Sequence, residues 1–182
     1  MEIHDTPIAG LKIIQPAVFG DRRGYFMESY NEAQFKGAGL PTHFVQDNQS
    51  MSAKNILRGL HFQAPPFAQG KLVRVIKGAV LDIALDIRKN SATYGQHFAL
   101  ELNETNKTML WIPPGFAHGF LTLADDSIFA YKCTEIYNQS SEGGVLWNDS
   151  ALGIAWGIAS PILSMKDETL PVLANFSSPF SE

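Results

Sequence analysis

The chain has 182 residues, of which 45% are hydrophobic and 18% charged, and its formal net charge at pH 7 is −4. These values are typical of one globular domain whose core is large enough to need neither disulfides nor a structural metal. The slightly acidic balance excludes a basic nucleic-acid-binding surface, and no apolar run is long enough to cross a bilayer. We therefore expect a single domain over residues 1–182, with no nucleic-acid or membrane partner.

Short apolar runs separated by turn residues dominate the chain and predict many β-strands. In chain order the expected strands are LKIIQPAVF, GYFMESY, HFVQDNQSMS, ILRGLHFQ, KLVRVIKG, AVLDIALDIR, QHFALEL, TMLWIP, HGFLTL and SIFAYKCT. In AVLDIALDIR apolar residues alternate with others, so one face should be buried and the other more polar. Lys77-Gly78 predicts a tight hairpin between the two strands that flank it.

Helices are expected to be few. NEAQFKGAG predicts one short helix with Asn31 as its N-cap, ended by Gly39-Leu40-Pro41. The segment after about residue 160 is expected to be partly helical, and the tail from about residue 175 weakly ordered. Many short strands with few helices favour a sandwich or barrel, and a jelly roll accommodates this number of strands. We predict a mainly all-β fold of the jelly-roll type.

The expected strand ILRGLHFQ carries unusual polar residues. Its aliphatic frame predicts burial, yet it contains Arg58, His61 and Gln63, and buried polar groups cost free energy unless they are paired. In a flat strand His61 would share a face with Gly59, and Arg58 would point the other way. If Arg58 and His61 serve one pocket, Gly59 should mark a bulge or twist; otherwise the two side chains belong to different surfaces.

A metal site is the first alternative for these histidines. The run PPGFAH, which ends at His118, resembles the second metal-binding motif of cupins. The first cupin motif has two histidines separated by one residue, whereas here Gln63 stands in place of the second. Catalytic first-row metal sites usually have at least three histidine or carboxylate ligands. We therefore expect no metal, and His118 becomes a candidate pocket-wall residue.

Groups suited to anion binding are plentiful. GDRRGYFMESY offers arginines and Glu28, and Gln46 and Asn48 share a face of VQDNQS. Arginine suits bidentate recognition of phosphate oxygens. Because Arg23, Arg58 and Lys71 interrupt apolar or glycine-rich runs, a binding role is favoured for them over scattered surface charge.

Taken together, several stretches resemble the dTDP-4-dehydrorhamnose 3,5-epimerases. The matching stretches run in the family's order across about residues 10 to 170 and are DRRGYFMESY, FVQDNQSMS, LRGLHFQ, AQGKLVRVIKGAVLDIALDIR, LWIPPGFAHGF, YKCTEIY, EGGVLWND, LGIAW and PILSMKD. The resemblance implies a jelly-roll fold of the cupin-like barrel type, a homodimer, no cofactor, and a thymidine-diphosphate 4-keto-6-deoxy sugar as substrate.

The resemblance also implies roles for individual residues. The family's catalytic base matches His61, its carboxylate partner Asp167, the acid on the opposite sugar face Tyr131, and the lysine near the keto oxygen Lys71. Positions implied to bind substrate are Arg23, Glu28, Gln46, Asp47, Asn48, Arg58, His118, Glu142 and Lys166. The family often has a second aromatic residue five positions after Tyr131, where this chain has Ile136 followed by Tyr137. The aromatic that stacks on the thymine therefore stays open, with Phe19, Tyr25 and Phe26 as candidates.

The implied reaction inverts C3 and C5 of dTDP-4-dehydro-6-deoxy-D-glucose and gives dTDP-4-dehydro-L-rhamnose, by proton abstraction at a histidine and reprotonation from a tyrosine. Alternatives are a related 3-epimerase, 5-epimerase or keto-sugar isomerase, a metal-dependent cupin enzyme, and a non-catalytic sugar-binding jelly roll. Cys133 is the single cysteine, and MEIHDTPIAG lacks the features of a signal peptide, so we expect a cytoplasmic location.

Overall fold

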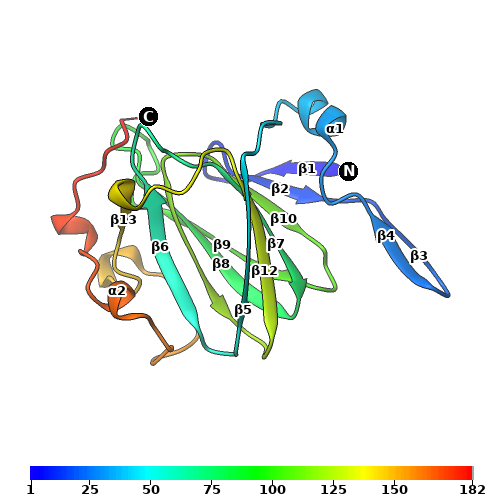
Figure 1. Cartoon of the computed structure of the whole chain (residues 1–182). Helices are drawn as coiled ribbons and strands as arrows, with labels where there is room; N and C mark the ends of the chain where they lie inside the picture. Colours follow the sequence, from blue (N-terminus) through cyan, green and yellow to red (C-terminus); the bar gives the residue numbers. More distant parts are fainter. Residues whose placement is uncertain (182) are drawn as a thin grey trace.

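Two antiparallel β-sheets packed face to face form the body of the computed structural model, which describes residues 1–181 (Figure 1). The six-stranded sheet contains, in spatial order, β1 (Glu2–Asp5), β2 (Lys12–Gln15), β10 (Met109–Ile112), β7 (Lys71–Lys77), β12 (Ser127–Cys133) and β5 (Gln46–Ser52). The five-stranded sheet contains β13 (Glu142–Gly144), β6 (Leu57–Gln63), β11 (Phe116–Thr122), β8 (Ala79–Asp86) and β9 (His97–Asn103). Strands β5 to β8 alternate between the sheets, as do β9 to β12, and the expected jelly-roll fold is confirmed.

A separate hairpin of β3 (Val18–Asp21) and β4 (Gly24–Met27) projects away from this body (Figure 1). The sequence predicted one strand through LKIIQPAVF, but the structure has two, β2 and β3, on either side of Pro16, which has no N–H to donate. The edge strands β1 and β13 were not predicted, because EIHD and EGG show no apolar alternation.

The hairpin predicted at Lys77-Gly78 is wrong. Strand β7 pairs with β10 and β12, whereas β8 pairs with β11 and β9, so Gly78 lies where the chain crosses from one sheet to the other. Gly78 has a φ of +79°, and a Cβ atom there would lie 2.4 Å from Ser127 Oγ. A hairpin turn and a corner between sheets both favour glycine at positive φ, so the local sequence does not distinguish them.

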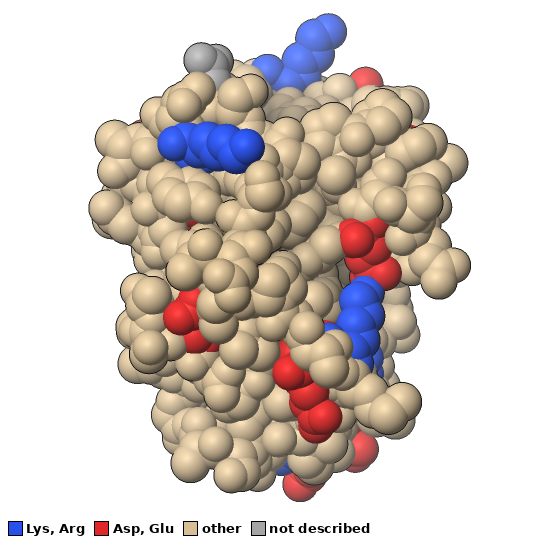
Figure 2. All heavy atoms as spheres, turned by 90° about the vertical axis from the view of Figure 1, so that its left-hand side faces the viewer, with Lys and Arg blue, Asp and Glu red and all other residues tan. Residues whose placement is uncertain are grey.

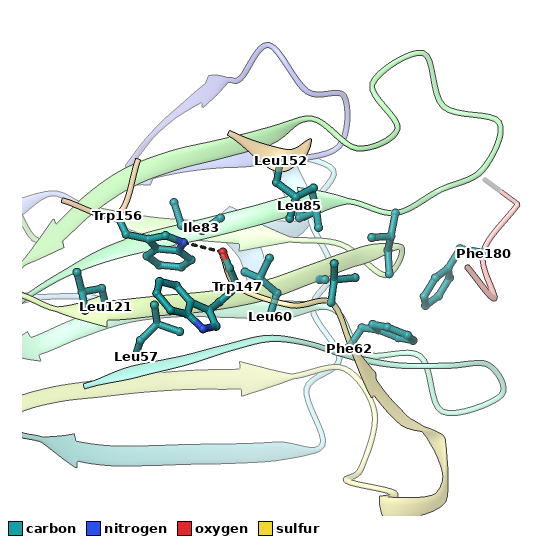
Figure 3. Close-up of a cluster of buried hydrophobic side chains, with 13 residues drawn as sticks. Leu57, Leu60, Phe62, Ile83, Leu85, Leu121, Trp147, Leu152, Trp156 and Phe180 are labelled. Carbon is teal, nitrogen blue, oxygen red and sulfur yellow. Dashed lines mark hydrogen bonds between the residues drawn. The ribbon is translucent and has the colours of Figure 1, made fainter. Parts of the chain in front are cut away.

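Hydrophobic side chains pack on both faces of the five-stranded sheet. One cluster fills the space between the sheets and includes Val73, Val80 and Phe129. A second covers the outer face under the C-terminal segment, where Trp147 and Trp156 pack beside Ile83 (Figure 3). Strand β8 is therefore buried on both sides. The predicted alternation is confirmed, and its more polar face, which carries Asp82 and Asp86, is buried as well.

Two short helices complete the fold: α1 (Glu32–Gly37) and α2 (Met165–Glu168). Asn31 caps α1 by accepting a hydrogen bond from the backbone N–H of Gln34, as predicted, and Phe35 packs the helix against the outer face of the six-stranded sheet. The partly helical character expected after residue 160 is confirmed by α2 and by a 3₁₀ turn at Leu173–Asn175.

The C-terminal segment covers one side of the molecule. Its surface is largely uncharged and interrupted by only a few acidic and basic side chains (Figure 2). Phe180 is buried and contacts Phe62 edge to face, and its carbonyl accepts a hydrogen bond from Lys89 N. These contacts hold the tail against the sheet, whereas the sequence alone predicted weak order from about residue 175. Within residues 1–181, no helix combines the length and apolarity needed to span a membrane.

Candidate active site

A cavity of about 440 Å³ opens between the two sheets. The five-stranded sheet contributes side chains of β6 and β11 to its wall, the six-stranded sheet those of β7 and β12, and the segment leading into α2 closes one side. The polar lining residues are Ser50, Arg58, His61, Lys71, His118, Tyr131, Ser164 and Asp167. A smaller recess of about 100 Å³ shares His61, Lys71 and Tyr131 with the cavity and adds Gln46, Asn48, Gln63, Gln69, Tyr137 and Glu142.

Strand β6 shifts its register at Gly59. His118 lies opposite His61, but Phe120, two residues further on, lies opposite Arg58, three residues back, so β6 has one extra residue there. Gly59 has a φ of +129°, and a Cβ atom there would lie 2.5 Å from Gly119 Cα. The bulge or twist that a common pocket requires is therefore present, and Arg58 and His61 line the same cavity.

His61 is held by a carboxylate from α2. Its Nε2 lies 2.5 Å from Asp167 Oδ1, while Asp167 Oδ2 accepts a hydrogen bond of 2.9 Å from Ser164 Oγ. Burial alone would raise the pKa of Asp167, but the hydrogen bond and charge of His61 keep it below its usual value. Asp167 is therefore ionised near neutral pH, and it fixes the imidazole with Nδ1 left to take a proton.

His118 forms a second pair, with Asp82 of β8. The two are buried, and His118 Nε2 lies 2.8 Å from Asp82 Oδ2. Asp82 Oδ1 is the one buried side-chain oxygen or nitrogen atom in residues 1–181 that has no hydrogen-bond partner. Sequence reasoning predicted His118 but missed Asp82. The sequence does show a carboxylate within an apolar strand. The alternation of β8 assigned Asp82 to the more polar face of that strand, so no role in a site was inferred for it.

Lys71 and Tyr131 occupy the opposite wall. Lys71 Nζ lies 5.9 Å from the centre of the Tyr131 ring. Burial lowers the pKa of Lys71, and the negative charges of Asp82 and Glu142 oppose that shift. Burial raises the pKa of Tyr131, so its hydroxyl keeps its proton at neutral pH. The wall that faces the two histidines therefore presents the Lys71 amine and one O–H donor.

Four more of the predicted residues line or border the smaller recess. Glu142 of β13 forms an ion pair with Lys166 of α2 and accepts a hydrogen bond of 3.1 Å from the Tyr137 hydroxyl. In the same recess, Gln46 donates to Asn48 Oδ1 at 3.0 Å. Tyr137 was noted in the sequence only as a neighbour of Ile136.

Three of the predicted substrate-binding residues lie outside the cavity. Arg23 sits on the projecting hairpin and forms an ion pair with Asp21, and Glu28 accepts hydrogen bonds at the start of α1. Asp47 points to the outer face of the six-stranded sheet, where it pairs with Lys132 at 2.9 Å. Within one chain, the structure therefore does not bring Arg23, Glu28 and Asp47 to His61.

Gln63 does not offer its amide to a metal, because its oxygen and nitrogen are both hydrogen-bonded to backbone groups. Within the described residues, no three or more histidine, cysteine, aspartate or glutamate side chains cluster closely enough to hold a metal ion.

Comparison with known proteins places these features in a family. The family model for dTDP-4-dehydrorhamnose 3,5-epimerase matches residues 5–175. A relative of that name from Salmonella typhimurium is 53% identical over 175 residues, which cover 95% of this chain and 96% of the relative. The chain belongs to the dTDP-4-dehydrorhamnose 3,5-epimerase family. The family predicted from the sequence is thereby confirmed.

Similar solved structures are also those of sugar epimerases. The 3,5-epimerase of Legionella pneumophila Philadelphia 1, solved in complex with dTDP-4-keto-L-rhamnose, has a TM-score of 0.92 and 44% identity, covering 97% of this chain and 94% of that one. A 3'-monoepimerase of Streptomyces bikiniensis, in complex with dTDP-quinovose, has a TM-score of 0.90 and 32% identity, covering 94% and 87%. The fold is therefore common to epimerases that differ in the number of centres they invert.

Proposed function

We propose that this member of the family inverts C3 and C5 of dTDP-4-dehydro-6-deoxy-D-glucose to give dTDP-4-dehydro-L-rhamnose. The observation that carries the proposal is the placement of His61, paired with Asp167, on one wall of the cavity, with Tyr131 and Lys71 on the other. A sugar between the two walls would have a base on one face and an acid on the opposite face, as inversion requires.

The reaction needs only proton transfers. The hydrogens on C3 and C5 are both adjacent to the C4 ketone, so removal of either gives an enolate with its charge on the C4 oxygen. His61 would accept the proton at Nδ1, and Asp167 would stabilise the resulting imidazolium. Lys71 would stabilise the enolate oxygen, and Tyr131 would return a proton to the opposite face. Because nothing is oxidised or reduced, this chemistry needs no redox cofactor.

Arg58, Gln46, Asn48, His118, Glu142 and Lys166 would bind the substrate around this centre. Arg58 supplies a guanidinium suited to diphosphate oxygens, and it is held near Ser52 Oγ at 3.1 Å. Binding of the distant nucleotide fixes the sugar between the base and the acid, so that part of the binding energy is used for orientation.

Arg23 and Glu28 lead to a proposal about assembly. Their hairpin projects from the body, and its side chains Val18, Phe19, Tyr25 and Phe26 are 42–66% exposed (Figure 1). An exposed apolar patch of this kind is typical of a contact surface. We propose a homodimer in which the hairpin of one subunit reaches the cavity of the other, with Arg23 and Glu28 at the nucleotide.

A subunit-mixing experiment tests this assembly. His61→Asn and Arg23→Ala variants should each be nearly inactive or bind substrate poorly. Hybrid dimers formed by co-expression would contain one cavity with both residues intact, and should regain a substantial share of wild-type activity. Hybrids no more active than the two parents would exclude a shared site.

Because a nucleotide sugar is a cytosolic metabolite and Cys133 is a free thiol, we also propose a cytoplasmic location.

The reaction itself is tested by incubation with dTDP-4-keto-6-deoxyglucose in deuterated water. We expect exchange at C3 and C5, and formation of dTDP-L-rhamnose when a reductase is added. His61→Asn should abolish both exchanges, and near wild-type exchange in that variant would remove His61 as the base. In Tyr131→Phe exchange should persist while the epimerised product is lost.

The second candidate function is epimerisation at one carbon only, because the structure is also similar to that of a monoepimerase. Exchange at one carbon only would support it. The 53% identity to the Salmonella typhimurium 3,5-epimerase, against 32% for the monoepimerase, favours two centres.

A further inference from the structure

Gln63, two residues after His61, is buried, and its amide is fully engaged. Its Nε2 donates to the carbonyl of Phe67 at 2.7 Å and to that of Ile136 at 3.1 Å, and its Oε1 accepts from Asn138 N at 2.7 Å. The opposite amide orientation would place an oxygen against two carbonyl oxygens, so the partners fix the orientation.

One of these bonds, to Phe67, holds the loop between β6 and β7, and the other two hold the loop between β12 and β13. The N–H of Tyr137 donates to Gln46 Oε1 at 2.8 Å, and that of Asn138 donates to Gln63. The loop residues 136–138 are thus each held by a glutamine side chain that comes from β5 or β6.

The loop connects Gln63 to the rim of the cavity. Tyr137 lines the recess beside His61, and its hydroxyl donates to Glu142, which lies opposite Gln63 in the pairing of β13 with β6. Glu142 in turn pairs with Lys166, the neighbour of Asp167. His61, Lys71 and Tyr131 lie on strands, whereas Tyr137 lies in the loop between β12 and β13.

We propose that Gln63 is a positioning residue that holds the loop 136–138, and through it Tyr137 and Glu142, in the geometry that binds substrate. The inference rests on the proposed epimerase function. Loss of Gln63 should therefore impair binding by the rim more than proton transfer at the centre.

The test is the steady-state kinetics of Gln63→Met, which keeps the side-chain length and removes all three bonds. We expect KM to rise about tenfold, with kcat within about threefold of wild type. A purely structural role would lower the amount of active enzyme, so apparent kcat would fall and KM would stay constant. That result, or unchanged kinetics, would overturn the proposal. If wild type converts no substrate, the proposed function fails instead.

A control variant and a double-mutant cycle make this test more specific. Gln15 on β2 also has both amide atoms hydrogen-bonded, to Asn106 O and from Thr108 Oγ1, far along the chain from the site; Gln15→Met should leave KM unchanged. In a Tyr137→Ala background, Gln63→Met should raise KM by much less than in wild type, because both act through one loop. Fully multiplicative effects would overturn the proposal.

If Gln63→Met does not fold, Gln63→Leu serves, since it removes the same three bonds with a different apolar shape. A raised KM would support the role, and a wild-type KM would refute it.

Discussion

Arg58 and His61 lie three residues apart on β6 and still line one cavity, because the strand shifts register at Gly59 between them. The same shift brings Leu57 and Leu60, also three apart, into the hydrophobic cluster on the other face. In a regular strand, residues three apart point to opposite faces. The irregularity therefore sorts four side chains correctly: two polar groups to the site and two leucines to the core.

Gly59→Ala should disrupt this arrangement. An alanine there would need a φ of +129° and would place Cβ 2.5 Å from Gly119 Cα. Because Gly119 Cα is a backbone atom, it cannot move aside as the end of a flexible side chain could. We expect a loss of about 1–3 kcal/mol in the free energy of unfolding, and a lower kcat because His61 is displaced. Urea unfolding and deuterium exchange would measure these. Gly153→Ala is the control: its φ is +60°, but no atom lies within 4 Å of the added Cβ. Equal losses in the two variants would contradict the role of the close contact.

The sequence predicted the strands and most of the cavity because both depend on local pattern or on short motifs. His61, Lys71, Tyr131 and Asp167 come from four separate segments, and the structure brings all four together. Each was predicted from its match to a family motif, and the residue pattern alone left the pairing of His61 undecided.

The sequence alone did not predict which distant strands pair with each other. Gly78 was predicted to form a hairpin because the next strand pattern follows at once, but the partners of β7 and β8 lie elsewhere in the chain. Asp82 was missed for a related reason: only the position of β11 beside β8 brings it to His118. Arg23 lies on the projecting hairpin and pairs with Asp21, so within one chain neither the local pattern nor the fold brings it to His61.

Asp167→Asn tests the pair that orients His61. An amide cannot stabilise an imidazolium as a carboxylate does, and it can hold the wrong tautomer, so kcat should fall about 100-fold or more. KM should change little, because Asp167 is buried and its two oxygens are bonded to His61 and Ser164. Rates of C3 and C5 exchange would report the effect. Glu168→Gln, the same change of charge at the exposed neighbouring position, should retain wild-type rates; a wild-type rate in Asp167→Asn would refute the role.

The Lys71→Met variant is expected to lose activity without losing stability. Because Lys71 is proposed to stabilise the enolate oxygen, its loss should slow exchange at both carbons by about 10²–10³-fold. Burial lowers the pKa of Lys71, which means that the ammonium is held in an unfavourable environment, so its replacement by an apolar chain should leave thermal stability equal or higher. Lys77→Met is the control, since Lys77 is exposed on the same strand. A variant that is both slow and strongly destabilised would instead indicate a structural role.

Asp86 anchors a buried network at the end of β8. Its carboxylate accepts hydrogen bonds from the Arg88 guanidinium at 2.7 and 2.9 Å, and from Ser91 Oγ and Thr93 Oγ1, each at 2.6 Å. Arg88 also donates to Ala9 O, so the network joins the loop after β8 to the N-terminal segment. Burial alone would raise the pKa of Asp86, but the hydrogen bonds from Arg88, Ser91 and Thr93 keep it below its usual value.

This lowered pKa predicts how stability depends on pH. Since the pKa of Asp86 is lower in the folded state than in the unfolded chain, the carboxylate stabilises the fold fully above the unfolded value of about 4, and this contribution is lost as pH falls through the folded pKa. Asp86→Asn should cost about 3 kcal/mol at pH 7, and the deficit should shrink below pH 4. Urea unfolding of wild type and variant across this range would measure it, with the exposed Asp126→Asn as control. A deficit that stays constant with pH would mean that packing around Asp86, and not its ionised carboxylate, holds the network together.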